Sequence, residues 1–281
     1  MIISNIITKG AKILKKNNIE NYNLDSEVLL TVITKKEREY SIINDRLKIG
    51  RKDYLKYFKL IVRRKKKEPI AYILKKKEFW SKNFFVDRDV LIPRPDTEII
   101  LEDIKNRFIN KTKLNVLDIG IGSGCILFSI LQEFQNFRGV GIDKSKKAIK
   151  IAKYNAKILK LDKRVKLLNC DIDNYKLDKY DIVVSNPPYI CSHKIKYLSD
   201  DIKKYEPKIA LDGGLTGLVV IEKIINRAKK LLKIGGYLYL EIGNDQYKDV
   251  ELMLKKNCFR INNKIKDYSK NIRCIISTNL K

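Results

Sequence analysis

The sequence has little of what many catalytic and structural sites are built from. There is one histidine, His193, which excludes a histidine-based triad or relay and leaves a surface role for that side chain. The five cysteines are scattered without a C-x-x-C pair, which argues against a disulfide framework and a zinc site. No apolar run approaches the roughly 18 residues that cross a bilayer, and the N-terminus lacks the cleavage site of a signal peptide. We therefore expect a cytoplasmic protein that holds no metal ion.

Acidic residues are also scarce, at 33 against 60 basic ones, which leaves a formal net charge of +27. Such an excess suggests a polyanionic partner such as nucleic acid. Lysine supplies most of it, however, and is spread through nearly every segment, which is more typical of a solvated surface. Both interpretations stay open at this point. With a single histidine, we expect the chemistry of this chain to use little acid–base machinery.

Local patterns divide the chain into three stretches. Residues 1–75 repeat apolar side chains at helical spacing, which predicts a small helical bundle. In residues 76–95, aromatic and polar residues alternate around a Ser-Lys-Asn turn, as in a β-hairpin that links two domains. From residue 96 to 281, strand-like runs alternate with amphipathic helical segments. The predicted fold class is α/β: a doubly wound, mostly parallel Rossmann-like sheet with a terminal antiparallel hairpin, preceded by the bundle and the hairpin linker.

A glycine-rich loop follows the first strand-like run, in "VLDIGIGSG". Gly120, Gly122 and Gly124 lie between that strand and a helix, where glycines let a ligand approach the backbone closely. Asp143 ends the run "GVGID" about 20 residues on, the place of an acid that holds ribose hydroxyls. The third glycine of a dinucleotide fingerprint is missing, and Asp118 supplies a carboxylate that suits a cationic amino group and would repel phosphate. These features indicate an adenosine ligand without phosphates, such as S-adenosylmethionine.

The run "DIVVSNPPYI" ends a strand on a rigid loop. Its prolines fix φ at roughly −65° and remove backbone donors, so the loop offers carbonyls and the Asn186 side-chain oxygen as acceptors. Ligands of an open α/β sheet lie outside the carboxyl ends of its strands. Two acceptors on the N–H bonds of a planar amine or amide would turn its lone pair toward an incoming methyl group, while Tyr189 packs on the planar group. The pattern predicts methylation of an NH₂ group by positioning, without a strong base.

Further motifs run along the chain: "EPIAYILKKKEFW", "VLIPRPDTE", "YEPKIALDGGLTGL", "GGYLYLEIGNDQ" and "DYSKNIR". With the glycine loop and "SNPPYI", their order and spacing resemble those of the peptide chain release factor N5-glutamine methyltransferase family over nearly the whole chain. That family methylates the glutamine of the Gly-Gly-Gln loop of class I release factors, with S-adenosylmethionine as the methyl donor. The resemblance implies this activity and a helical N-terminal domain that helps to grip the factor. We further expect a monomer that needs neither nucleic acid nor membrane.

The resemblance also implies the residues of the site. The cofactor-binding residues expected are Asp118, Gly120, Ile121, Gly122, Ser123, Gly124, Asp143, Asp171, Ile172 and Asn186. The substrate-binding residues expected are Leu91, Arg94, Asn186, Pro187, Pro188 and Tyr189, and Asn186, Pro187 and Tyr189 are expected to be catalytic. Two positions depart from the family pattern. Ile121 replaces a common threonine, and Ile172 stands where many members have an aromatic residue over the adenine, which would weaken adenine binding.

Three other functions stay open. A sister activity would methylate a ribosomal-protein glutamine, and a DNA amino-methyltransferase would need a target-recognition segment, for which no large insertion follows "NPPYI". The non-enzymatic alternative is a basic nucleic-acid-binding module on an inactive methyltransferase fold. The intact Asp118, Asp143, Asn186 and Tyr189 argue against this last alternative.

Overall fold

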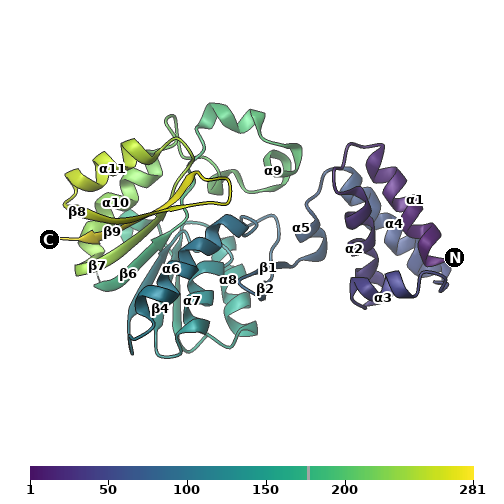
Figure 1. The fold of residues 1–281 in the computed structure, drawn as a ribbon, viewed down its shortest axis with the longest axis horizontal. Helices are drawn as coiled ribbons and strands as arrows, with labels where there is room; N and C mark the ends of the chain where they lie inside the picture. Colours follow the sequence, from purple (N-terminus) through teal and green to yellow (C-terminus); the bar gives the residue numbers. More distant parts are fainter. Residues whose placement is uncertain (176–177) are drawn as a thin grey trace. The chain divides into compact units, whose positions relative to one another are not determined.

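The computed structural model describes residues 1–175 and 178–281, and the chain forms two compact units (Figure 1). The helical unit comprises residues 1–76 and 199–205, and the sheet unit comprises residues 77–198 and 206–281. None of the helices in the described residues combines the length and the apolar character needed to cross a membrane.

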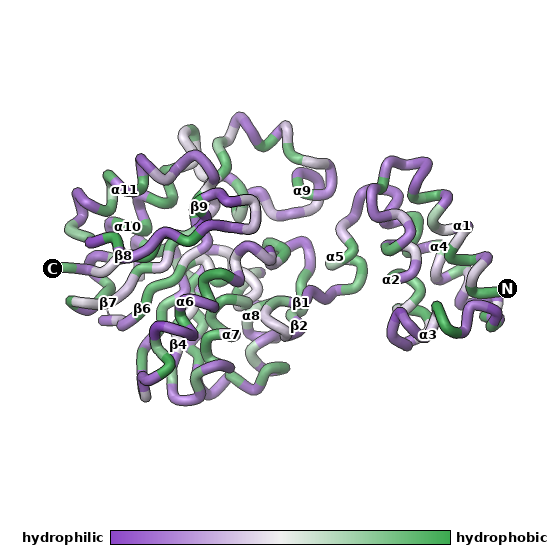
Figure 2. Tube along the Cα trace, in the orientation of Figure 1, coloured by the Kyte–Doolittle hydropathy of each residue, from purple (hydrophilic) through white to green (hydrophobic). Residues whose placement is uncertain are grey.

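The helical unit is a bundle whose helices turn apolar sides toward one another. Its helices are α1 (Ile3–Lys15), α2 (Tyr22–Thr34), α3 (Arg38–Ile43), α4 (Arg51–Lys65), α5 (Ile70–Leu74) and α9 (Asp200–Tyr205). Apolar and polar residues alternate along them (Figure 2), and α1 buries Ile3, Ile6 and Leu14 at helical spacing. Inside the bundle, the hydroxyls of Ser26 and Tyr57 share a hydrogen bond of 2.6 Å.

Helix α9 comes from far along the sequence, and its place in the helical unit was not anticipated by the sequence patterns. The Tyr205 hydroxyl donates a hydrogen bond of 2.8 Å to the Lys66 carbonyl. The segment thus leaves the sheet unit, contributes one short helix to the bundle and returns.

The expected hairpin is present, formed by β1 (Lys77–Phe79) and β2 (Lys82–Phe84) in antiparallel pairing. The expected Ser-Lys-Asn turn is wrong by one residue, because the turn is Trp80-Ser81. Both turn residues have positive φ, 50° and 55°, as a two-residue turn matched to the twist of a hairpin requires. The last residue of each strand is a phenylalanine buried in the core of the sheet unit, so the hairpin packs within that unit.

The sheet unit is built on a seven-stranded sheet with the order β5-β4-β3-β6-β7-β9-β8. Its strands are β3 (Asn115–Ile119), β4 (Arg138–Asp143), β5 (Val165–Asn169), β6 (Tyr180–Ser185), β7 (Leu232–Glu241), β8 (Phe259–Lys266) and β9 (Ile272–Asn279). The pairings from β5 to β7 are parallel, and β9 pairs antiparallel with both β7 and β8. This confirms the predicted doubly wound sheet with its terminal antiparallel hairpin.

Helices cover both faces of this sheet because successive strand residues point to opposite sides. Val116 and Leu117, for example, belong to different core clusters. One face packs on α6 (Ile99–Phe108), α7 (Cys125–Glu133) and α8 (Lys146–Ile158), and the other on α10 (Val219–Leu231) and α11 (Tyr247–Lys256). Short 3-10 segments are η1 (Pro95–Glu98), η2 (Ile172–Asn174), η3 (Ser192–Tyr197) and η4 (Lys208–Ala210). The strand order reverses between β3 and β6, the place where open sheets bind ligands.

Candidate active site

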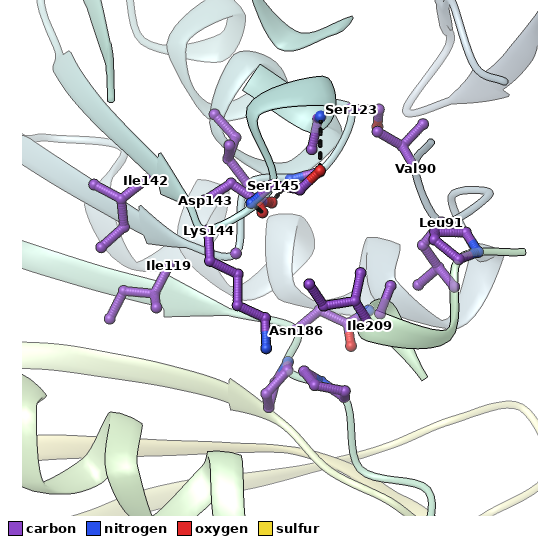
Figure 3. A pocket seen from close by; sticks show the side chains of 18 of the residues that line it. Val90, Leu91, Ile119, Ser123, Ile142, Asp143, Lys144, Ser145, Asn186 and Ile209 are labelled. Atoms are coloured by element: carbon purple, nitrogen blue, oxygen red, sulfur yellow. Dashed lines mark hydrogen bonds between the residues drawn. The ribbon is translucent and has the colours of Figure 1, made fainter. Parts of the chain in front are cut away.

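A cavity opens at the carboxyl ends of β3, β4 and β6, within the sheet unit (Figure 3). Most of the predicted site residues line it: Leu91, Arg94, Gly120, Ile121, Gly122, Ser123, Asp143, Asp171, Ile172, Asn186, Pro187 and Pro188. Asp118, Gly124 and Tyr189 are not among its lining residues. The structure therefore brings together the two motifs, the glycine loop and the Asn-Pro-Pro loop, that lie more than sixty residues apart in the sequence.

The glycine loop leaves open space where side chains would otherwise project. Gly120 and Gly122 have φ of +77° and +55°, and a Cβ added at Gly120 would meet no atom within 4 Å. At Gly122 the nearest atom would be a backbone oxygen at 4.0 Å. Any other residue at these positions would be strained and would fill the cavity.

Asp143 faces the glycine loop from the end of β4. One carboxylate oxygen accepts the Gly122 N–H at 3.0 Å, and the other accepts the Ser145 N–H at 2.8 Å. Burial raises the pKa of Asp143, and the two backbone donors oppose that effect. The same carboxylate lines the cavity (Figure 3). Because two backbone N–H groups hold it, its orientation is fixed before any ligand arrives.

Gly124 is explained by packing. Its φ is +86°, and an added Cβ would lie 2.2 Å from the ring of Phe128 in α7. This glycine thus allows the helix that starts at Cys125 to approach the loop. Gly124 does not line the cavity, and its predicted contact with the cofactor stays a prediction.

Asp118 lies behind the loop, 2% exposed, and its Oδ2 atom has no hydrogen-bond partner. Burial raises the pKa of Asp118 to about 7. A buried carboxyl group with an unpartnered oxygen is suited to a cationic neighbour, in keeping with the sequence expectation. That expectation remains a prediction, since Asp118 does not border the cavity.

The Asp118→Asn substitution should change how stability depends on pH. The pKa of Asp118 is higher in the folded than in the unfolded chain, so Asp118 loses its proton at a lower pH when the chain is unfolded. The contribution of Asp118 to the free energy of unfolding of the wild type therefore falls between about pH 4 and pH 7, by roughly 1.4 kcal/mol per pH unit. Asparagine does not titrate, so the variant should gain stability relative to wild type as the pH rises from 5 to 8. Denaturant unfolding at both pH values measures this difference. An unchanged difference would show that Asp118 is ionised throughout.

After the neighbouring strand β5, Lys223 of α10 binds Asp171 and Asp173, at 2.5 Å and 2.7 Å. The hydrogen bond from Lys223 is the main reason why the pKa of Asp171 is lowered. Ile172 is 7% exposed and belongs to the core while also bordering the cavity. Lys223 itself lines the cavity. The sequence reasoning missed this lysine because it reads as one more surface cation on an amphipathic helix.

Asn186, the first residue after β6, is half-buried and held from the side of η1. Its Nδ2 donates to Thr97 Oγ1 at 3.3 Å, and Thr97 Oγ1 donates to Glu241 Oε2 at 2.7 Å. Thr97 and Glu241 are each 2% exposed. Arg94 and Leu91, from the segment before η1, border the same cavity, and Arg94 forms a salt bridge with the buried Glu206. Sequence reasoning missed Thr97 and Glu241 although both lie in quoted motifs, because nothing in their spacing marks them as partners.

The Asn-Pro-Pro-Tyr loop is also fixed from behind. Gln246 Nε2 donates to the carbonyls of Tyr189, at 3.0 Å, and Gly217, at 3.1 Å. The Tyr189 ring lies 6.0 Å from the guanidinium of Arg273, and burial raises the pKa of Tyr189 to about 12. Tyr189 thus supports the loop, and its contact with a substrate stays a prediction. The exposed His193 does not border the cavity.

Comparison with known proteins identifies this arrangement. A family model described as "Methyltransferase domain" matches residues 110–276, and one described as "PrmC N-terminal domain" matches residues 5–74. The release factor glutamine methyltransferase of Clostridium acetobutylicum is 39% identical over 280 residues, covering 99% of this chain and 98% of that protein. The protein of the same name from Buchnera aphidicola subsp. Acyrthosiphon pisum is 40% identical, with 94% of each chain covered. The chain belongs to the release factor glutamine methyltransferase family.

Solved structures show how widely the fold of this family member is shared. The hMettl16 catalytic domain, in complex with the MAT2A 3'UTR hairpin 6, superposes with a TM-score of 0.60 at 13% identity, covering 90% of this chain and 93% of that one. The tRNA m1G37 methyltransferase of M. jannaschii gives 0.51 at 17% identity, covering 73% and 56%. At these identities the likeness concerns the fold alone. For this member of the release factor glutamine methyltransferase family, specificity must therefore be argued from the site.

Proposed function

We propose that this chain transfers a methyl group from S-adenosylmethionine to the side-chain amide nitrogen, N5, of the glutamine in the Gly-Gly-Gln motif of class I peptide chain release factors. The observation that carries this proposal is the orientation of the Asn186 side-chain amide. Its NH₂ end is bound to Thr97, so its oxygen is free to accept from a substrate in the cavity. The family to which the chain belongs supports the choice of substrate.

Several residues of the cavity support S-adenosylmethionine as the methyl donor. S-adenosylmethionine supplies a methyl group on a positively charged sulfur, which is the electrophile of the reaction. Gly120 and Gly122 leave room for it along the backbone, where added Cβ atoms would project into open space. Asp143 would accept from the ribose hydroxyls, and Asp171, kept ionised by Lys223, would accept from the adenine amino group.

The residues around the glutamine amide act by orientation. The Asn186 side-chain oxygen and the Pro187 carbonyl would each accept one N–H of the substrate NH₂ group. The nitrogen lone pair, delocalised in a free amide, then faces the methyl group, and the two acceptors stabilise the nitrogen as it becomes positive. As the N–CH₃ bond forms, the S–CH₃ bond breaks and its electron pair stays on sulfur, giving S-adenosylhomocysteine, and the methylated nitrogen then loses one N–H proton to water. This assignment uses no side-chain base, in keeping with the single exposed histidine.

A methyl-transfer assay with labelled donor tests the assignment. We expect transfer to a purified class I release factor and little transfer to ribosomal proteins or DNA oligomers. The same factor with its Gly-Gly-Gln glutamine changed to asparagine is the matched control. An amide one methylene shorter cannot reach both acceptors and the methyl group at once, so transfer should fall to background. Methylation of DNA with none of the release factor would overturn the proposal.

A further inference from the structure

Behind Asn186 lies a buried pair, Thr97 and Glu241, from two elements far apart in the sequence. Thr97 belongs to η1 and Glu241 ends β7, and the Thr97 hydroxyl donates to the Glu241 carboxylate at 2.7 Å. Both are 2% exposed, so water does not compete for this hydrogen bond. Only Thr97 reaches the cavity.

The direction of this hydrogen bond decides which end of the Asn186 amide faces Thr97. A hydroxyl group has one hydrogen to donate, and a carboxylate can only accept. Because Thr97 gives its hydrogen to Glu241, its oxygen has lone pairs left for a donor. The Asn186 Nδ2 is that donor, at 3.3 Å. The oxygen end of the amide must then point away from Thr97.

Glu241 is the acceptor of this hydrogen bond in its ionised form, which its polar neighbours favour and its burial opposes. Burial raises the pKa of Glu241 to about 7, while hydrogen bonds from Thr97 and Tyr189 and the charge of Arg273 favour its ionised form. Asp96 opposes them. Tyr189 and Arg273 thus act on Glu241, at the far end of the same chain of hydrogen bonds.

We propose that Thr97 and Glu241 are positioning residues that hold the Asn186 amide in one of its two orientations, with the side-chain oxygen toward the substrate nitrogen. The proposal rests on the proposed function, for which it defines the specificity for an NH₂ group. An Asn amide has nearly the same shape after a half-turn about its last bond. In the turned orientation its NH₂ group would face the substrate NH₂ group, and two donors repel each other.

The pair should therefore set the preference for glutamine over glutamate. With its oxygen in the cavity, Asn186 accepts from an amide and repels a carboxylate. A variant that lets Asn186 turn presents donors to the cavity, which a carboxylate accepts. Loss of the Thr97 hydroxyl should weaken binding of a glutamine-bearing release factor relative to the same factor with glutamate at that position.

The experiment compares Thr97→Val, which has nearly the same shape without the hydroxyl, with Thr97→Ser, which keeps the hydroxyl. Thr278→Val is the matched control, because Thr278 is also buried and donates to an asparagine, Asn262, at 2.7 Å, outside the cavity. We expect Thr97→Val to lower methyl transfer about tenfold while donor affinity stays within about twofold. Thr97→Ser and Thr278→Val should stay within about threefold of wild type. If Thr97→Val fails to bind the donor, Thr97→Ala takes its place.

Two further readouts separate positioning from damage to the fold. The first is the ratio of inhibition constants for the glutamate-bearing and glutamine-bearing factors, which should shift toward glutamate by about fivefold or more in Thr97→Val alone. The second needs no substrate. In protein labelled with ¹⁵N in asparagine, the Asn186 NH₂ signals, identified by their loss in Asn186→Ala, should exchange with water faster in Thr97→Val than in Thr97→Ser.

The outcomes distinguish this inference from the proposed function. If wild type transfers no methyl group to a release factor, the function fails, and the exchange of the Asn186 amide still tests the pair. If Thr97→Val keeps the wild-type preference for glutamine and the wild-type exchange, the pair does not orient Asn186, whatever happens to the rate. A shifted preference with intact donor binding supports the inference.

Discussion

Replacement of Asn186 by alanine should lower methyl transfer on the order of a hundredfold or more and leave donor affinity within about twofold, the usual pattern for removing one preorganised polar group at a reacting centre. Asn186 is half-buried at the end of β6 and already bound through its nitrogen, so its oxygen costs no reorganisation when a substrate arrives. Alanine leaves the substrate NH₂ group with the Pro187 carbonyl alone. The measurements are single-turnover transfer to a release factor and calorimetry of donor binding.

Asn115→Ala is the control for this substitution, because Asn115 is the first residue of β3 and lies at the amino ends of the parallel strands, whereas the cavity lies at their carboxyl ends. Its transfer rate should remain near that of wild type. Equal losses of transfer and of donor affinity in Asn186→Ala would mean that Asn186 binds the donor and does not orient the substrate. Transfer within about threefold of wild type would remove Asn186 from the mechanism.

The strands and the two loops of the site could be predicted from the sequence because each is encoded locally. The run from Tyr180 to Ser185 has an apolar, β-branched centre, Ile-Val-Val, and it is followed by Asn186 and two prolines, which end the strand. The glycine loop is marked in the same way by residues that only a tight turn needs. The order of such signals along the chain was enough to predict a doubly wound sheet and the edge where ligands bind.

The supporting contacts could not be predicted because they join residues that share no local pattern. Thr97 and Glu241 are 144 positions apart. Asn155, which holds the Ser123 carbonyl and the Phe85 backbone together, is one of many asparagines in the sequence. A hydrogen bond depends on tertiary packing, and a polar residue reads as a surface residue until its burial is known. For the same reason the sequence did not show that Gly124 also lets the ring of Phe128 approach, and its assignment to the ligand stays a prediction.

Replacement of Asp143 by alanine should weaken donor binding about tenfold to a hundredfold, since a hydrogen bond to a charged group contributes roughly 1.5 to 3 kcal/mol. Asp143 accepts from the N–H groups of Gly122 and Ser145 and borders the cavity, so the substitution removes the support of the glycine loop together with the proposed ribose contact. Calorimetry with S-adenosylmethionine and with its demethylated product measures the loss. Both should weaken equally, because they share the ribose.

Two variants separate the contributions of charge and shape at Asp143. Asp143→Asn keeps one acceptor and should bind the donor more tightly than Asp143→Ala, while Asp162→Ala removes a carboxylate from the exposed turn between α8 and β5. The donor carries positive charge, so a general electrostatic effect would weaken binding in Asp162→Ala as well. We expect no such change, because exposed charges at that distance are screened. Donor affinity within about twofold of wild type in Asp143→Ala would show that donor binding needs neither a ribose contact nor loop support from this carboxylate.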